Sequence, residues 1–156
     1  MSASSHNLAS VKSTNTRPEL YVRSGLHRTG LRFRLHNRNL PGTPDLYFAK
    51  HKLCLFINGC FWHRHDCHLF KWPKTREEFW RNKITRNQQR DKMQFDQLLV
   101  SGYRVGIVWE CSIKGKLRIP EERFFEVLIG QIVGSEDFFE ILGSTIENLT
   151  RSRRVT

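Results

Sequence analysis

The chain has 156 residues, with 26 Lys and Arg against 15 Asp and Glu, and 38% of its residues are hydrophobic. That length suits one domain, and the 11 Phe and 4 Trp supply a core, which excludes a disordered tail or a collagenous repeat. No apolar run approaches the roughly 18 residues of a membrane span, and the polar N-terminus lacks a secretory core. We therefore expect a soluble intracellular protein.

Positive charge is concentrated in one part of the chain. Residues 1–120 carry a net charge of +14, whereas residues 121–156 carry −3. Such an excess favours a polyphosphate partner, because each neutralised DNA or RNA phosphate releases counterions. The alternative is a basic protein that is merely soluble.

The N-terminal half predicts one helix and a first strand. Thr16 is in the position of an N-cap and Glu19 in that of its capping-box partner, so a helix is expected from there to about Gly30. In residues 31–35 apolar residues alternate with arginines, which is typical of a strand with one solvated face.

The remainder predicts further strands and helices. Residues 59–73 are expected to be irregular, and a second capping box at Thr75 opens a helix, in one piece or two, that ends at Gly102. A helical apolar pattern begins at Pro120. Further strands are predicted at about residues 45–49, 52–57 and 103–109. Helices interleaved with a small mixed sheet indicate an α/β fold.

Four cysteines point to metal binding rather than to disulfides. An even count allows two disulfides, but a chain without an export signal stays where thiols are reduced. Cys54 lies inside the apolar run 53–57 and is expected to be a small buried hydrophobe. Three thiols therefore remain for a metal: Cys60, Cys67 and Cys111.

The segment 58–68 supplies the other metal ligands. Zinc prefers four thiolate or imidazole ligands in a tetrahedron, so one histidine would complete a three-cysteine site. The spacing is not that of common zinc fingers, and a polar loop with incidental thiols is the alternative. His63, His65 and His68 compete for the fourth position.

A second group of residues suggests phosphodiester hydrolysis. Asp45 enters a predicted strand after the proline-stiffened turn 41–44. Hydrolysis needs a fixed carboxylate that holds a divalent ion against the scissile phosphate. Most Pro-Asp pairs are simply turns, but here Glu19, His63 and a basic surface accompany this one.

Several motifs together carry a family resemblance. They are Leu-Pro-Gly-Thr-Pro-Asp at 40–45, Gly-Cys-Phe-Trp-His at 59–63, Thr-Arg at 75–76 with Phe-Trp at 79–80, and Val-Trp-Glu-Cys at 108–111. From about Ser5 to Gly115 the chain resembles the very-short-patch mismatch repair endonucleases, the Vsr family. The resemblance implies a restriction-endonuclease-like α/β fold with a small mixed central sheet flanked by helices and a structural zinc site.

The resemblance also implies an activity and its setting. It implies a magnesium-dependent nickase that cuts double-stranded DNA 5′ to the thymine of a T:G mismatch, a product of 5-methylcytosine deamination. Such an enzyme acts as a monomer in very-short-patch repair, beside a cytosine-5 DNA methyltransferase, on the nucleoid in a bacterial cytoplasm. Residues 1–156 would form one nuclease domain, with a DNA-contacting arm (1–15), a catalytic core (16–115) and a C-terminal extension (116–156) to which we assign no pattern.

Carried over to this sequence, the resemblance assigns the catalytic roles. Asp45 and the backbone carbonyl of Ile57 would bind magnesium, and His63 would take a proton from water. Glu19 would hold metal-bound water, a role compatible with its capping-box position. The zinc ligands would be Cys60, His65, Cys67 and Cys111, which would leave His68 at the surface.

The family also inserts apolar side chains into the base stack. Phe61, Trp62 and Trp80 match its aromatic wedges, and Leu8 matches an insertion from the other groove; ordinary core packing is the alternative for the aromatics. Asn58 departs from the family, where a histidine or an acid is frequent, and an altered metal-water network would alter turnover.

Two rival functions remain. A restriction or homing-type endonuclease of the same fold would cut matched duplex, and the aromatic wedges argue against it. A zinc-stabilised DNA-binding protein without catalysis would need the cysteines but not Glu19, Asp45 and His63 together.

Overall fold

The protein forms a three-layer α/β structure around one sheet. Its computed structural model describes residues 14–143, 150 and 151. The sheet has six strands in the order β1-β2-β3-β4-β5-β6. Their bounds are Arg34–Leu35 (β1), Leu46–Phe48 (β2), Leu53–Asn58 (β3), Arg104–Trp109 (β4), Phe138–Ile141 (β5) and Thr150–Arg151 (β6).

The sheet is mixed, as predicted. The central strands β3, β4 and β5 run parallel, whereas β1, β2 and β6 are antiparallel to their neighbours. In the parallel pair, Asn58 at the end of β3 is level with Trp109 at the end of β4. The carboxyl ends of these two strands therefore deliver the segments that follow them, the loop after Asn58 and the 3₁₀ turn Glu110–Ser112 (η2), to the same edge.

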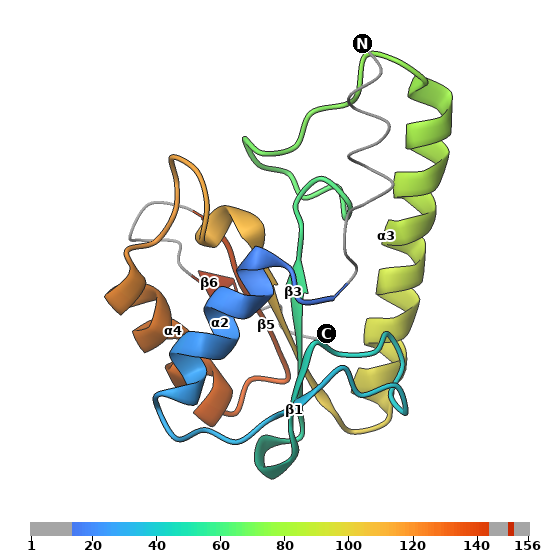
Figure 1. Cartoon of the computed structure of the whole chain (residues 1–156). Coiled ribbons are helices and arrows are strands. Elements are labelled where there is room, and N and C mark those ends of the chain that lie inside the picture. The colour runs from blue at the N-terminus through green and yellow to red at the C-terminus, as the bar shows by residue number, and fades with distance from the viewer. Residues whose placement is uncertain (1–13, 144–149, 152–156) are drawn as a thin grey trace.

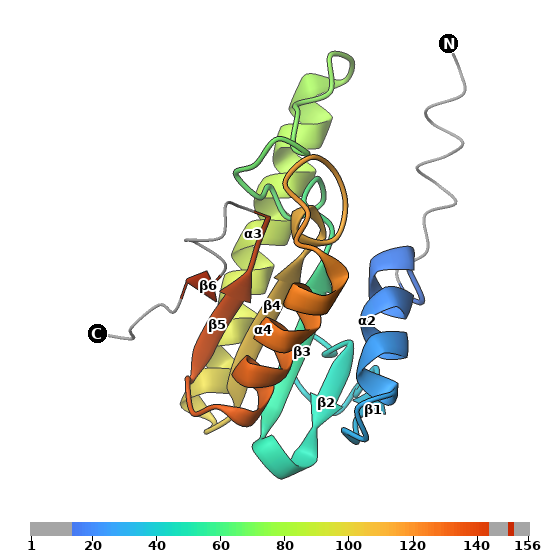
Figure 2. The same cartoon turned by 90° about the vertical axis from the view of Figure 1, so that its left-hand side faces the viewer.

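Three helices cover the two faces of the sheet. Helices α2 (Arg17–His27) and α4 (Glu121–Val133) lie on one face and α3 (Glu77–Val100) lies on the other (Figure 1, and turned in Figure 2). In β3, Leu53 and Leu55 join the core under α2 and α4, while Cys54 and Phe56 join the core under α3. Both faces are therefore buried, which explains why β3 is a continuous apolar run. No helix in the part of the chain described is long and apolar enough to cross a membrane.

One predicted helix start is confirmed and the other is wrong. Thr16 caps α2, and its hydroxyl accepts a hydrogen bond from the Glu19 amide at 3.4 Å. Thr75 does not cap α3. The N-cap is Arg76, in a left-handed conformation with no side-chain cap, and its guanidinium lies 4.2 Å from the centre of the Phe79 ring. This contact replaces the predicted capping box. Helix α3 is continuous over its 24 residues.

Other boundaries differ from the prediction. Helix α2 ends at His27, and the turn to Gly30 follows it. The strand expected over 31–35 pairs only at β1, although Phe33 still contacts Phe48, with ring centroids 5.6 Å apart. The segment 116–156 contributes α4, β5 and β6, so it supplies part of the sheet and of its covering layer.

Candidate active site and metal centre

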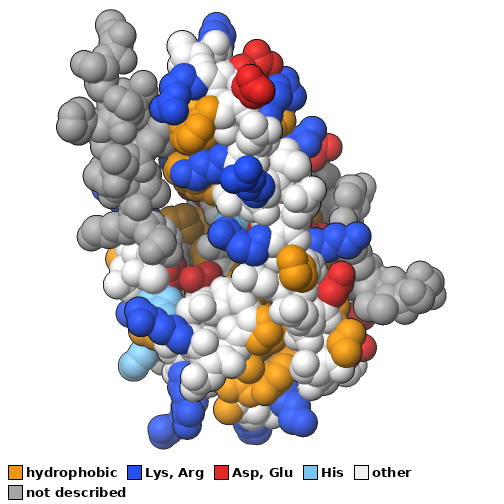
Figure 3. Space-filling model, turned by 90° about the vertical axis from the view of Figure 1, so that its right-hand side faces the viewer, with side chains coloured by type: hydrophobic (Ala, Val, Ile, Leu, Met, Phe, Trp, Pro, Cys, Tyr) orange, Lys and Arg blue, Asp and Glu red, His pale blue; other side chains and the backbone are white. Residues whose placement is uncertain are grey.

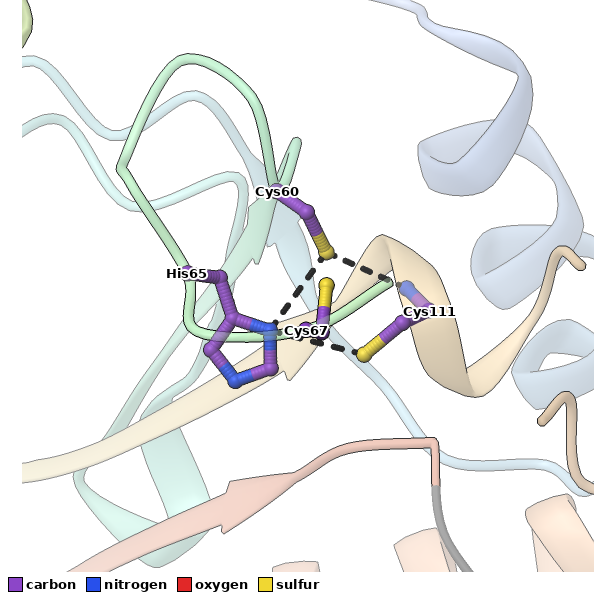
Figure 4. A group of neighbouring side chains, drawn as sticks. All are labelled: Cys60, His65, Cys67 and Cys111. Carbon is purple, nitrogen blue, oxygen red and sulfur yellow. Dashed lines mark hydrogen bonds between the residues drawn. The ribbon is translucent and has the colours of Figure 1, made fainter. Parts of the chain in front are cut away.

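Three cysteines and one histidine come together beyond the carboxyl ends of β3 and β4. Cys60 and Cys111 follow these strands, and His65 and Cys67 lie in the irregular loop between β3 and α3 (Figure 4). The four ligand atoms lie within 4.8 Å of one another. The Nδ1 atom of His65 is 3.6 Å from the Cys60 sulfur and 3.5 Å from the Cys111 sulfur. This group can hold one metal ion.

The surroundings of this Cys/His group stabilise negative charge on one sulfur. The pKa of the Cys111 thiol is lowered to about 4, first by a hydrogen bond from Cys60 and then by His65 and the Gly143 amide. That amide donates to the sulfur at 3.2 Å, and a Cβ on Gly143 would lie only 2.2 Å from the Cys111 carbonyl oxygen, so the approach requires glycine. A stabilised thiolate is the state that binds a metal.

The other cysteine and histidine predictions have mixed outcomes. Cys54 is fully buried in the core, as predicted, and burial raises the pKa of its thiol to about 12. His68 is not a surface residue. It is half-buried against Gly115, and both of its ring nitrogens are buried without a hydrogen-bond partner in the described structure.

A cleft of about 890 Å³ opens beside the Cys/His group. The ends of β3 and the loop after it form one wall, the turn before β2 forms another, and α3 forms a third. Of the predicted site residues, those that line the cleft are Asp45, Ile57, Asn58, Phe61, Trp62 and His63. Asn58 is buried, and its amide nitrogen has no partner among the described residues, which leaves this donor free for a ligand.

Glu19, His36 and Asp45 form a second group whose ligand atoms lie within 4.8 Å of one another. Glu19 is buried in the first turn of α2, where its Oε2 accepts the Asn15 amide at 2.9 Å. Its Oε1 lies 2.5 Å from His36 Nε2 and 3.6 Å from an Arg23 guanidinium nitrogen. The structure thus brings Glu19 and Asp45 together, as predicted, and adds a histidine that the sequence analysis missed.

The Asp45 carboxylate is held but only partly satisfied. Its Oδ2 accepts the Ile57 amide at 2.7 Å. The pKa of Asp45 is raised from 3.8 to about 6, mainly by burial and also by the charge of Glu19, against the opposing effects of the Ile57 amide, His36 and His63. Burial makes the charged form of this carboxylate unfavourable, and a cation bound beside it would stabilise that charge.

His63 is oriented by a residue that the sequence did not indicate. Its Nδ1 contacts the Asp91 carboxylate on α3 at hydrogen-bonding distance. The partners are 28 residues apart, and His63 lies in a loop without regular structure, so no spacing pattern in the sequence predicts the pair. Because the Asp91 carboxylate accepts a hydrogen bond, we assign the proton of the neutral His63 ring to Nδ1, which leaves Nε2 as an acceptor.

The predicted aromatic residues form a connected cluster. Phe61 contacts both Trp62 and Trp80, with ring centroids 5.1 and 5.5 Å apart, and Trp62 lies 5.8 Å from Trp80. Phe61 and Trp62 are half-buried at the cleft, whereas Trp80 is only 8% exposed beneath them. Leu8, the remaining predicted contact, lies outside the described residues.

A basic surface adjoins the cleft. Figure 3 shows Lys and Arg side chains spread over the face that α3 presents. The exposed cations of α3 and its N-cap are Arg76, Arg81, Lys83, Arg86, Arg90 and Lys92, of which Lys83 and Arg90 also line the cleft. Cations near a cleft of this kind attract the phosphates of a nucleic acid.

Comparison with known proteins identifies the family. Residues 2–69 match the DNA mismatch endonuclease Vsr family. The chain is 40% identical over 130 residues to the DNA mismatch endonuclease Vsr of Escherichia coli K12, covering 83% of each chain. It is 50% identical over 103 residues to the type II nicking enzyme V.XorIIP of Xanthomonas oryzae pv. oryzae, covering 66% of this chain and 76% of that enzyme.

A third relative is similar over about two thirds of the chain. The type II nicking enzyme V.NmeAIP of Neisseria meningitidis serogroup A is 40% identical over 106 residues, covering 68% of this chain and 76% of that enzyme. With the cleft and its basic face, these matches define the class: the chain is a DNA endonuclease. It belongs to the Vsr family of DNA mismatch endonucleases.

Proposed function

We propose that this endonuclease nicks one strand of duplex DNA 5′ to the thymine of a T:G mismatch, with magnesium as its catalytic ion and zinc as its structural ion. The observation that carries the proposal is the placement of Asp45, His63 and Asp91 in one cleft with the aromatic side chains of Phe61 and Trp62. Relatives named as nicking enzymes and as a mismatch endonuclease support cleavage of one strand at a mispair. Spontaneous deamination of 5-methylcytosine to thymine in methylated DNA would supply that mispair. The proposal therefore links the enzyme to a cytosine-5 methyltransferase.

The residues present fit a magnesium ion. Asp45 uses one carboxylate oxygen for the Ile57 amide, its other oxygen has no hydrogen-bond partner among the described residues, and Ile57 lines the same cleft. A carboxylate and a backbone carbonyl are the hard oxygen ligands that magnesium prefers. Bound there, the ion would neutralise charge on the scissile phosphate and acidify water. Glu19, tied by the Asn15 amide, would hold water at the edge of the site.

His63 is the residue we assign to proton transfer. With Nδ1 held by Asp91, its Nε2 would accept a proton from the attacking water and thereby generate the nucleophile. The Asp91 carboxylate fixes the ring orientation and stabilises the imidazolium that forms. Two members of the Cys/His group, Cys60 and His65, flank His63 in the same loop, so a zinc ion there would clamp the loop and fix His63.

Phe61 and Trp62 are the residues we assign to mismatch recognition. Opening a base step costs a few kcal/mol, and the cost is lowest at a mispair, so a stacking wedge converts weak pairing into selectivity. Lys83 lies over the ring of Trp62, 5.6 Å from its centre, so a phosphate contact and a stacking surface are adjacent. Trp80 would support the wedge from beneath.

The direct test is a nicking assay on matched pairs of duplexes. The protein with magnesium is incubated with strand-labelled duplexes that carry a T:G mispair in varied contexts, each beside its T:A and C:G controls. The proposal expects one cut, 5′ to the mispaired thymine, and intact controls. Equal cutting of the controls would favour a restriction-type enzyme, and binding without cutting would favour a DNA-binding protein.

Trp62→Ala is expected to weaken discrimination between mismatched and matched DNA. The lost stacking is worth roughly 1–3 kcal/mol per base, while no cation is removed, so the salt dependence of binding should stay nearly unchanged. Affinities for both duplexes at two salt concentrations, with the melting temperature, provide the measurement. Trp72→Ala is the matched control, since Trp72 stacks with Arg64 and Arg81 outside the cleft lining. An unchanged affinity ratio in Trp62→Ala would refute the wedge.

Asp45→Asn is expected to stabilise the protein in the absence of added divalent cation. The folded-state pKa of Asp45 is raised from 3.8 to about 6. The group therefore does not destabilise the folded state at low pH, and it destabilises it increasingly as the pH rises from 3.8 to about 6. Above that pH range the charged carboxylate lowers the free energy of unfolding by roughly 1–3 kcal/mol, and the isosteric amide of Asn avoids this loss. Melting temperatures should therefore differ more at about pH 7.5 than at about pH 5. A lower melting temperature for Asp45→Asn at the higher pH would contradict this expectation.

A further inference from the structure

His36 is placed to be a ligand of the active-site metal. Its Nε2 and the nearest oxygens of Glu19 and Asp45 lie within 4.8 Å of one another. Ligand atoms on opposite sides of an ion with bonds of about 2.1 Å lie about 4.2 Å apart, and adjacent ligands lie about 3 Å apart. The three groups therefore need only small movements to surround one ion.

The backbone holds His36 in this position at some cost. The residue directly follows β1 and has a φ of +48°, a conformation that is uncommon for residues other than glycine. Its amide donates to the Asp45 carbonyl at 3.1 Å, which joins the chain after β1 to the start of β2. The His36 ring lies close to the Asp45 carboxylate and contacts Glu19.

His36 would change the chemistry of the metal site. Carboxylate and carbonyl oxygens suit magnesium, whereas imidazole nitrogen suits first-row transition ions. The Nε2 atom of His36 contacts Glu19 Oε1 at 2.5 Å, so the nitrogen that would bind the ion already points at a second ligand. Binding through Nε2 requires the ring proton on Nδ1.

We propose that His36, through Nε2, is a direct ligand of the active-site ion and makes the site bind Mn²⁺ more tightly than Mg²⁺, the catalytic ion of the proposed function. The inference rests on the metal site of the proposed function, in which Asp45 is a ligand. It replaces the water-holding role of Glu19 with direct binding to the same ion, and it leaves His63, which lies outside this three-residue group and is held by Asp91, free to accept a proton.

The test measures coordination directly with Mn²⁺ bound to the zinc-loaded protein. Pulsed electron paramagnetic resonance detects the ¹⁴N nucleus of an imidazole bound to Mn²⁺. We expect that nitrogen signal in the wild type and in His63→Gln, and its loss in His36→Gln. Loss of a ligand should also raise the dissociation constant for Mn²⁺ at least about tenfold, with a smaller change for Mg²⁺. His27→Gln, at the exposed far end of α2, is the matched control and should retain both properties.

Each outcome decides the proposal. A nitrogen signal that survives in His36→Gln, disappears in His63→Gln, or is absent from the wild type with Mn²⁺ bound would overturn it. The T:G nicking assay separates this failure from that of the proposed function. Metal-dependent nicking without a His36 nitrogen signal overturns the ligand assignment alone, whereas the absence of both metal binding and nicking overturns both.

Discussion

Cys67→Ser is expected to release zinc and to unfold the irregular loop that carries His63. The four predicted ligands come from three separate segments, so one ion would join the end of β3, the loop and the turn after β4. A structural zinc of this kind supplies folding free energy on the order of 10 kcal/mol. Cys67 is the most exposed of the three thiols, so its substitution leaves little cavity and reports mainly on the metal.

The measurement combines zinc content with thermal stability. Purified wild-type protein should contain one zinc per chain, and Cys67→Ser should contain little and melt far below it. Cys54→Ala is the matched control, because Cys54 is buried in the core away from the Cys/His group and should retain zinc at a modest cost in stability. A Cys67→Ser protein that folds normally without zinc would show that the group has no structural metal.

The helix and strand features predicted correctly from the sequence are those set by neighbouring residues. Thr16 and Glu19 are three residues apart and close one capping interaction, so the start of α2 follows from local chemistry. The consecutive apolar side chains of β3 likewise point alternately to the two faces of the sheet, and both faces are buried. At Thr75 the same local pattern fails, because the Arg76 conformation and its contact with Phe79 override it.

The features that the sequence did not predict are contacts between distant residues. Asp91, the fifteenth residue of α3, meets His63, and His36 meets Glu19 across 17 residues, with no spacing motif for either pair. His36 directly follows the strand predicted over residues 31–35, and no role was predicted for it from the sequence. Its left-handed backbone directs it into the site, and neither composition nor periodicity encodes that turn.

Asp45→Ala is expected to abolish metal-dependent nicking while leaving mismatch binding largely intact. The carboxylate would hold the ion against the scissile phosphate, an interaction that contributes far more to the transition state than to ground-state affinity. His63→Ala should slow nicking by roughly 10²–10⁴-fold, the usual contribution of a positioned general base. Single-turnover nicking of a T:G duplex, with affinity measured in parallel, separates the two effects.

Asp91→Asn tests whether the His63 assignment has the right physical cause. The amide keeps the shape of the side chain but no longer stabilises an imidazolium, so nicking should fall steeply with zinc content and mismatch affinity unchanged. Asp96→Asn, an exposed position five residues further along α3, is the matched control and should nick like the wild type. If Asp45→Ala and His63→Ala both cut near the wild-type rate, the active site lies elsewhere. If Asp91→Asn alone cuts near the wild-type rate, His63 does not need Asp91 for proton transfer.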